Sequence, residues 1–230
     1  MPELIKAKEP FHFSTRLPLA ELTGLKAATL EQLVGLLKEV PASSIYHHTH
    51  RFMQQHQYLS PEPPNDFAYW VSTMLGEERL GERLASIDTI QFPTIQGLRE
   101  EIVSTIEEYL KERPSAARKF AGEGEELHFV KSVSFILSTP YVANDLKEFI
   151  EILKKISLDA IYFHIFEARL RLEKKSNDFS NWIENSLGDK PLADKISNLD
   201  PYTYTLEDLR RQILRILEKE LLVLQKEVAG

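Results

Sequence analysis

The stretch Ile45-Tyr46-His47-His48 is followed, after a proline-rich break, by Asn65-Asp66-Phe67-Ala68-Tyr69-Trp70. A weaker copy of both segments, at Ile161–His164 and Asn177–Trp182, lies in the second half of the chain. A recurrence of this kind predicts two tandem versions of one structural unit. We therefore predict an all-α fold in which two tandem homologous helical repeats pack with pseudo-two-fold symmetry, each repeat with at most one short extended segment.

Signals for strands and helix starts recur in the same order in both copies. The alternation at Phe11–Ser14 returns at Leu127–Val130 and is typical of a brief strand. Thr29 precedes an apolar stripe at helical spacing, and Asp145 precedes the matching stripe, so each is expected to cap a helix. The sequence thus predicts copy one at 10–110, a linker at 111–126 and copy two at 127–222.

Several of these landmarks together resemble a known family. They are Leu22–Ala27, Ser44–His48, Asn65–Trp70 and Leu75–Ala85. The chain is similar, over most of residues 10–110 and more loosely over the second copy, to an uncharacterised prokaryotic family described only as a domain of unknown function. The resemblance implies no activity and no catalytic residue.

Composition excludes several classes of protein. The chain has 230 residues, of which 43% are hydrophobic, and a formal net charge of −7 without a long run of basic residues, so nucleic acid is not an expected partner. Charged residues interrupt every apolar run, and no cationic-then-apolar leader opens the chain, so no membrane partner is expected. Cysteine is absent, which excludes disulfides and thiolate chemistry. We expect a soluble, cytoplasmic protein.

His48 and His164 lie at matching positions on apolar helical stripes and should point inward. Two interpretations stay open. Each imidazole is a core side chain satisfied by a backbone carbonyl or a carboxylate, or the two rings approach each other across the pseudo-symmetry axis and form a shared polar site.

The two copies differ on the helix that carries these histidines. Positions 47, 49 and 50 are His, Thr and His, whereas the second copy has Phe163, Ile165 and Phe166. One copy thus keeps polar groups where the other is apolar, which predicts a recognition surface in copy one. The ligand-binding candidates are Tyr46, His47, His48, His50, Arg51, Tyr162 and His164.

A metal site is the sharper alternative on the same helix. His47 and His50 share a helix face and could join Gln54 or His56 from neighbouring turns to bind zinc or iron. Such a site usually needs a third ligand from elsewhere, such as His12 or a carboxylate. No cofactor is otherwise indicated, and a divalent metal is the one alternative. The Asn-Asp pairs before Trp70 and Trp182 could be catalytic acids of a sugar site, but helix capping explains them at lower cost.

Nucleotide-binding glycine loops and nucleophile motifs are absent, and the catalytic residues are unknown. We expect a binding or regulatory protein that recognises a protein or small molecule through the second helix of copy one. The alternatives are a small metal-dependent hydrolase that uses His47, His48 and His50, and a structural oligomerisation module, for which a homodimer is the simplest assembly.

Overall fold

The computed structural model describes residues 6–50, 65–168, 176–199 and 204–229. The chain divides into two compact units. The central unit comprises Pro18–Ser134, and the terminal unit combines Met1–Leu17 with Phe135–Gly230. That residues 10–110 and 127–222 are two sequence repeats stays a prediction. The two compact units have other boundaries, because each strand contributes residues to both units.

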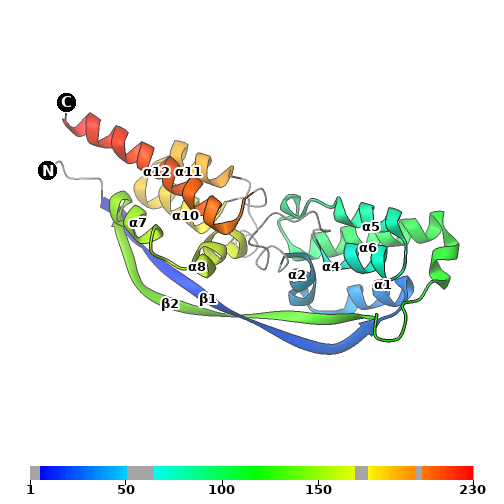
Figure 1. Ribbon diagram of the computed structural model, residues 1–230. Helices are drawn as coiled ribbons and strands as arrows, with labels where there is room; N and C mark the ends of the chain where they lie inside the picture. The colour runs from blue at the N-terminus through cyan, green and yellow to red at the C-terminus, as the bar shows by residue number, and fades with distance from the viewer. Residues whose placement is uncertain (1–5, 51–64, 169–175, 200–203, 230) are drawn as a thin grey trace. The chain divides into compact units, whose positions relative to one another are not determined.

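The predicted all-α class is wrong, and with it the pair of purely helical repeats packed by pseudo-two-fold symmetry. The protein is mixed α/β: of the described residues, 61% are helical and 21% are in strands. β1 (Lys6–Ala27) and β2 (Leu127–Asp145) form a two-stranded antiparallel sheet, shown blue and green in Figure 1. The predicted brief strands cover only the early part of β1 and of β2. Beyond them most strand side chains are exposed and lack the alternation that predicts a strand.

Each strand begins in one unit and ends in the other. The first part of β1 carries Phe11 and Phe13, which pack on Phe149 of the terminal unit. The first part of β2 carries Phe129, which packs on Phe67 of the central unit. The opening part of each strand is therefore buried by helices from the other half of the sequence.

The central unit is built from helices that pack against one another (Figure 1). α1 (Leu30–Glu39) and α2 (Ala42–His50) pack on α6 (Ile95–Glu112), and α4 (Asp66–Thr73) packs on α5 (Glu78–Ala85). Two short 3-10 helices lie at Thr89–Gln91 and Pro114–Arg118. Thr29 caps α1 as predicted, since its side chain accepts a hydrogen bond from the N–H of Gln32.

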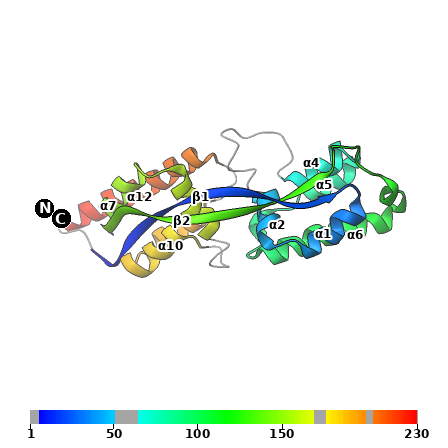
Figure 2. The ribbon, with the colours of Figure 1, turned by 90° about the horizontal axis from the view of Figure 1, so that it is seen from below.

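The helices of the terminal unit also pack in pairs. α7 (Leu146–Leu153) and α8 (Leu158–Tyr162) pack on α12 (Leu206–Ala229), and α10 (Asp178–Trp182) packs on α11 (Lys190–Ser197). Figure 2 labels α7, α10 and α12 among them. π-helical segments continue α8 at Phe163–Glu167 and α10 at Ile183–Leu187. Asp145 caps α7, as predicted, and Gly188 ends the π-helical segment after α10 with a φ of 76°, a conformation that favours glycine.

The capping role of Asn65 leads to a first prediction. Its Oδ1 accepts from the N–H of Ala68 at 2.8 Å, and its Nδ2 donates to the carbonyl of Leu84 at 3.0 Å, so one buried amide holds the start of α4 and the end of α5. Asn65→Ala should lower the free energy of unfolding by about 1–2 kcal/mol. Denaturant titration measures this loss, and the exposed Asn181→Ala should change stability by less than about 0.5 kcal/mol. Equal losses in both variants would contradict the capping account.

Candidate functional site

His48 on α2 binds both a carboxylate and a strand within the central unit. Its Nδ1 lies 2.7 Å from Oδ2 of Asp66, the first residue of α4, and its Nε2 accepts the N–H of Val130 on β2 at 3.0 Å. Because Nε2 accepts a hydrogen bond, the proton of the neutral ring is on Nδ1, which donates to Asp66. The imidazole is 3% exposed and the Asp66 side chain 45% exposed, so a buried ring connects two helices and a strand through one half-exposed carboxylate.

The terminal unit contains the same arrangement. His164 Nδ1 lies 2.8 Å from Oδ2 of Asp178, and the N–H of Ser14 on β1 donates to His164 Nε2 at 2.9 Å. Val130 follows Ser14 by 116 positions, and His164 follows His48 by the same 116. In each unit a histidine therefore binds the strand that comes from the other half of the sequence.

Each ring thus meets a carboxylate, as one of the two interpretations of the inward histidines expects. Each ring has its acceptor nitrogen filled by a strand N–H and its donor nitrogen turned to a carboxylate of its own unit. A general base or a metal ligand needs a lone pair, and in this tautomer the only lone pair is the one used by the strand. The geometry of His48 and His164 therefore suits strand attachment, with a carboxylate as the partner rather than a carbonyl.

His47 and His50 lie on the same helix in different surroundings. His47 Nδ1 is 3.0 Å from the hydroxyl oxygen of Ser132 on β2, and its ring is 7% exposed. Thr49 donates its hydroxyl proton to the carbonyl of Ile45 at 2.7 Å, so its oxygen accepts from His50 Nδ1, also at 2.7 Å. The proton of His50 is thus on Nδ1, and its Nε2 keeps a lone pair.

Burial sets the charge of His50. The side chain is 2% exposed, and the loss of hydration lowers its pKa to about 4. His50 is therefore neutral at pH 7. Among the described residues none donates a hydrogen bond to its Nε2. Tyr46 stacks on the ring, with centroids 5.2 Å apart.

Tyr162 and Phe166 occupy the corresponding place in the terminal unit. Their rings stack with centroids 4.8 Å apart, as the rings of Tyr46 and His50 do at 5.2 Å. A phenyl ring, which has no nitrogen, therefore stacks in the same way. The guanidinium of Arg16 lies 4.0 Å from the centre of the Tyr162 ring and pairs with Glu167. Sequence reasoning missed Arg16 because the residue 116 positions later is Ser132, so a comparison of the two halves gave no signal there.

Of the predicted metal ligands, the structure describes His47, His48 and His50. No group of three or more His, Asp or Glu side chains in 6–50, 65–168, 176–199 and 204–229 is placed to hold a metal ion. Arg51, Gln54 and His56 lie outside the described residues, so the structure does not test them as ligands. As metal ligands His47 and His50 stay a prediction, and their Nδ1 atoms point to Ser132 and Thr49.

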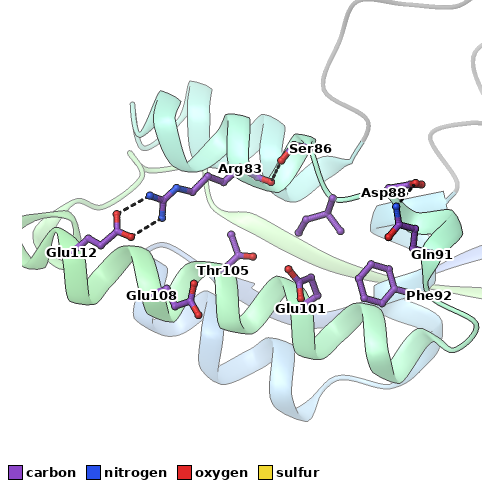
Figure 3. A pocket seen from close by; sticks show the side chains of 10 residues that line it. Arg83, Ser86, Asp88, Gln91, Phe92, Glu101, Thr105, Glu108 and Glu112 are labelled. Carbon is purple, nitrogen blue, oxygen red and sulfur yellow. Dashed lines mark hydrogen bonds and ion pairs between the residues drawn. The ribbon is translucent and has the colours of Figure 1, made fainter.

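A groove between α5 and α6 is a feature that the sequence did not predict (Figure 3). It has a volume of about 520 Å³. Arg83 crosses its end and donates two hydrogen bonds to Glu112, which lowers the pKa of that carboxyl. The other lining residues are Ser86, Ile87, Asp88, Gln91, Phe92, Glu101, Thr105 and Glu108. The spacing of 101, 105, 108 and 112 puts these side chains on one face of α6, so the groove is acidic along one wall.

A buried carboxylate also escaped prediction. Glu77, 1% exposed, accepts from the hydroxyl of Tyr109 and lies 2.9 Å from Nζ of Lys119 and 3.5 Å from Arg113. Burial raises its pKa, but the hydrogen bonds from Tyr109 and Lys119 lower it further, so the pKa lies below its usual value. Because Lys119 also donates to the carbonyl of Gly76, this cluster attaches the segment after α6 to the turn between α4 and α5.

Comparison with known proteins gives a family without an assigned activity. A family of unknown function, DUF5752, matches residues 8–218, so the chain belongs to this family. It is also similar to a solved structure described as the structure of OrfY from Thermoproteus tenax, with 29% identity and a TM-score of 0.79. The similarity covers 94% of this chain and 98% of that one. A comparison with curated proteins gives no match. No helix among the described residues is long and apolar enough to cross a membrane.

Proposed function

We propose that this protein is a binding or regulatory protein rather than an enzyme, and that α2 of the central unit carries its recognition site. The observation that supports this most directly is His50. Its neutral ring offers an acceptor nitrogen that no described residue uses, at a position where the terminal unit has Phe166. The fold therefore accepts a phenyl ring in this environment, and the nitrogen is not needed for the stacking.

Burying an imidazole in place of a phenyl ring costs stability, because the polar ring loses its hydration while a phenyl ring gains from burial. A donor on a ligand or partner that reaches Nε2 would complete the hydrogen bonding of this side chain. His47, Thr49 and Tyr46 form the rest of the proposed site.

Binding should disappear when this nitrogen is removed. His50→Phe, alone and combined with His47→Phe, copies the terminal unit and should leave the melting temperature unchanged or higher. Thermal-shift screening of wild type against small metabolites and divalent metals identifies a ligand, and titration calorimetry then compares the variants. We expect His50→Phe to abolish binding and the exposed His128→Phe to leave it unchanged. A ligand that binds His50→Phe normally, or a double variant that unfolds, would contradict the proposal.

The metal-dependent hydrolase stays the alternative, and elemental analysis separates it. His48 would first have to release the N–H of Val130 before its Nε2 could bind a metal. Stoichiometric zinc, iron or manganese in protein purified without a histidine tag would favour the hydrolase over the binding protein.

We also propose that the chain consists of two tandem copies of one unit, each with a strand followed by helices. The paired contacts support this, because Trp70 Nε1 donates to the carbonyl of Glu125 while Trp182 Nε1 donates to that of Glu9. Likewise Thr23 donates to the carbonyl of Phe129 and Thr139 to that of Phe13. Duplication followed by divergence accounts for a recognition site in one copy and a hydrophobic counterpart in the other.

A further inference from the structure

The groove between α5 and α6 carries more negative than positive charge (Figure 3). Four carboxylates and one guanidinium line it, which gives its walls a net charge of −3. The guanidinium of Arg83 is already paired with Glu112, and the shorter of its two hydrogen bonds is 2.7 Å. The other lining carboxylates on α6 are Glu101 and Glu108. Within the described residues Glu101 has no hydrogen bond or ion pair, and Glu108 accepts a hydrogen bond only from Ser104, at 3.4 Å.

These two carboxylates lie on one face of α6. Glu101 and Glu108 are seven residues apart, which is about two helical turns and corresponds to about 10.5 Å between their Cα atoms. Both side chains are exposed. Glu108 also lies one turn before Glu112, and like charges at this spacing destabilise a helix. A cation in the groove would relieve this repulsion.

The groove also has an apolar part. Ile87 and Phe92 line it, and both pack on the hydrophobic core of the central unit. Each side chain is only partly buried, so it offers apolar surface to an aliphatic chain in the groove. An inorganic cation could not use this surface. The walls therefore suit a ligand that combines positive charges with hydrocarbon.

The corresponding helix pair of the terminal unit lacks the carboxylates. Arg99 on α6 donates to the carbonyl of Lys38, and Arg210 on α12 donates to that of Lys154, so α12 matches α6 with an offset of 111 residues. At this offset the acidic positions 101, 108 and 112 are matched by Gln212, Lys219 and Val223. The packing of such a helix pair therefore does not require acidic side chains at these positions.

We propose that this groove binds a linear aliphatic polyamine, with ammonium groups on Glu101 and Glu108 and the methylene chain across Ile87 and Phe92. Ammonium groups and carboxylates form charge-assisted hydrogen bonds. Spermidine fits the spacing, because a bond of about 1.5 Å advances an extended chain by about 1.25 Å and its terminal nitrogens are then about 11 Å apart. The groove shares no residue with the site proposed around His50, so either proposal can fail without the other.

Titration calorimetry of the full chain at low ionic strength tests this site without any variant. Wild type should bind spermidine. It should bind putrescine, whose nitrogens lie only about 6 Å apart, at least about tenfold more weakly, because the shorter diamine reaches one carboxylate at a time. Absence of binding at about 1 mM spermidine overturns the proposal. Binding of Mg²⁺ or of a short oligolysine peptide more tightly than spermidine would show a different occupant and overturns it as well.

Matched variants show whether the groove itself holds the polyamine. Glu101→Gln combined with Glu108→Gln should weaken spermidine binding about tenfold or more, because two charge-assisted contacts are lost. Glu100→Gln combined with Glu107→Gln removes the same charge from α6 outside the groove and should change the dissociation constant by less than about threefold. Unchanged binding in the groove variant overturns the proposal. Equal weakening in both double variants also overturns it, because the acidic chain would then attract cations in general.

Discussion

Lowering the pH from 7 to 4 is expected to destabilise the wild-type protein by about 3 kcal/mol more than the His50→Phe variant. The pKa of His50 is about 4 in the folded protein, against the ordinary value of 6.5 that represents the unfolded chain. Below pH 6.5 the unfolded chain takes up a proton that the folded chain refuses until about pH 4, so protonation favours unfolding across this window. The difference of about 2.5 pKa units corresponds to about 3 kcal/mol. Above pH 7 the contribution is zero.

Urea titrations of both proteins between pH 7.5 and 4 measure this effect. The comparison isolates His50, because every other side chain is the same in the two proteins. The exposed His128→Phe should keep the wild-type pH profile. Parallel profiles for wild type and His50→Phe would show that the imidazole stays hydrated in the folded protein and is not held neutral by burial.

The sequence predicted helix starts well because their signals are local. A cap such as Thr29 or Asn65 acts on backbone groups within three residues, so its spacing is visible in the chain. The inward position of His48 and His164 was also visible, because helical periodicity places a side chain relative to its own helix. What periodicity could not reveal is the partner of each ring, since Val130 lies 82 positions from His48 and Ser14 lies 150 from His164.

The strands were underestimated for a related reason. Alternation appears only where helices bury a strand on one face, as at Phe11 and Phe13, and the exposed middle of β1 carries Pro18 and Gly24, which are typical of turns. The strands are instead held together by pairing between segments more than 100 residues apart, for example through Thr23 and Phe129. Charge pairing in Glu77 and its partners is equally non-local, because Lys119 reaches it from beyond α6.

Removal of the His48 ring should cost about 3 kcal/mol of stability and loosen β2 in the central unit. His48→Ala leaves a cavity among buried side chains, and it removes the acceptor of the Val130 N–H, a loss that ranges from about 1 to 3 kcal/mol for a buried donor. His164→Ala should act in the same way on Ser14 and β1.

Hydrogen exchange distinguishes this specific role from general packing. In His48→Ala the amide of Val130 should exchange faster than the loss of global stability alone predicts. The exchange rate of the Ser14 amide should rise only by the amount that the loss of global stability predicts. His164→Ala should show the reverse. Asp66→Ala should have a smaller effect than His48→Ala, because the Asp66 side chain is 45% exposed and water can replace its hydrogen bond to His48. If both amides respond equally to either substitution, the histidines stabilise the fold by bulk alone, and the attachment of each strand to the opposite set of helices must depend on the phenylalanines.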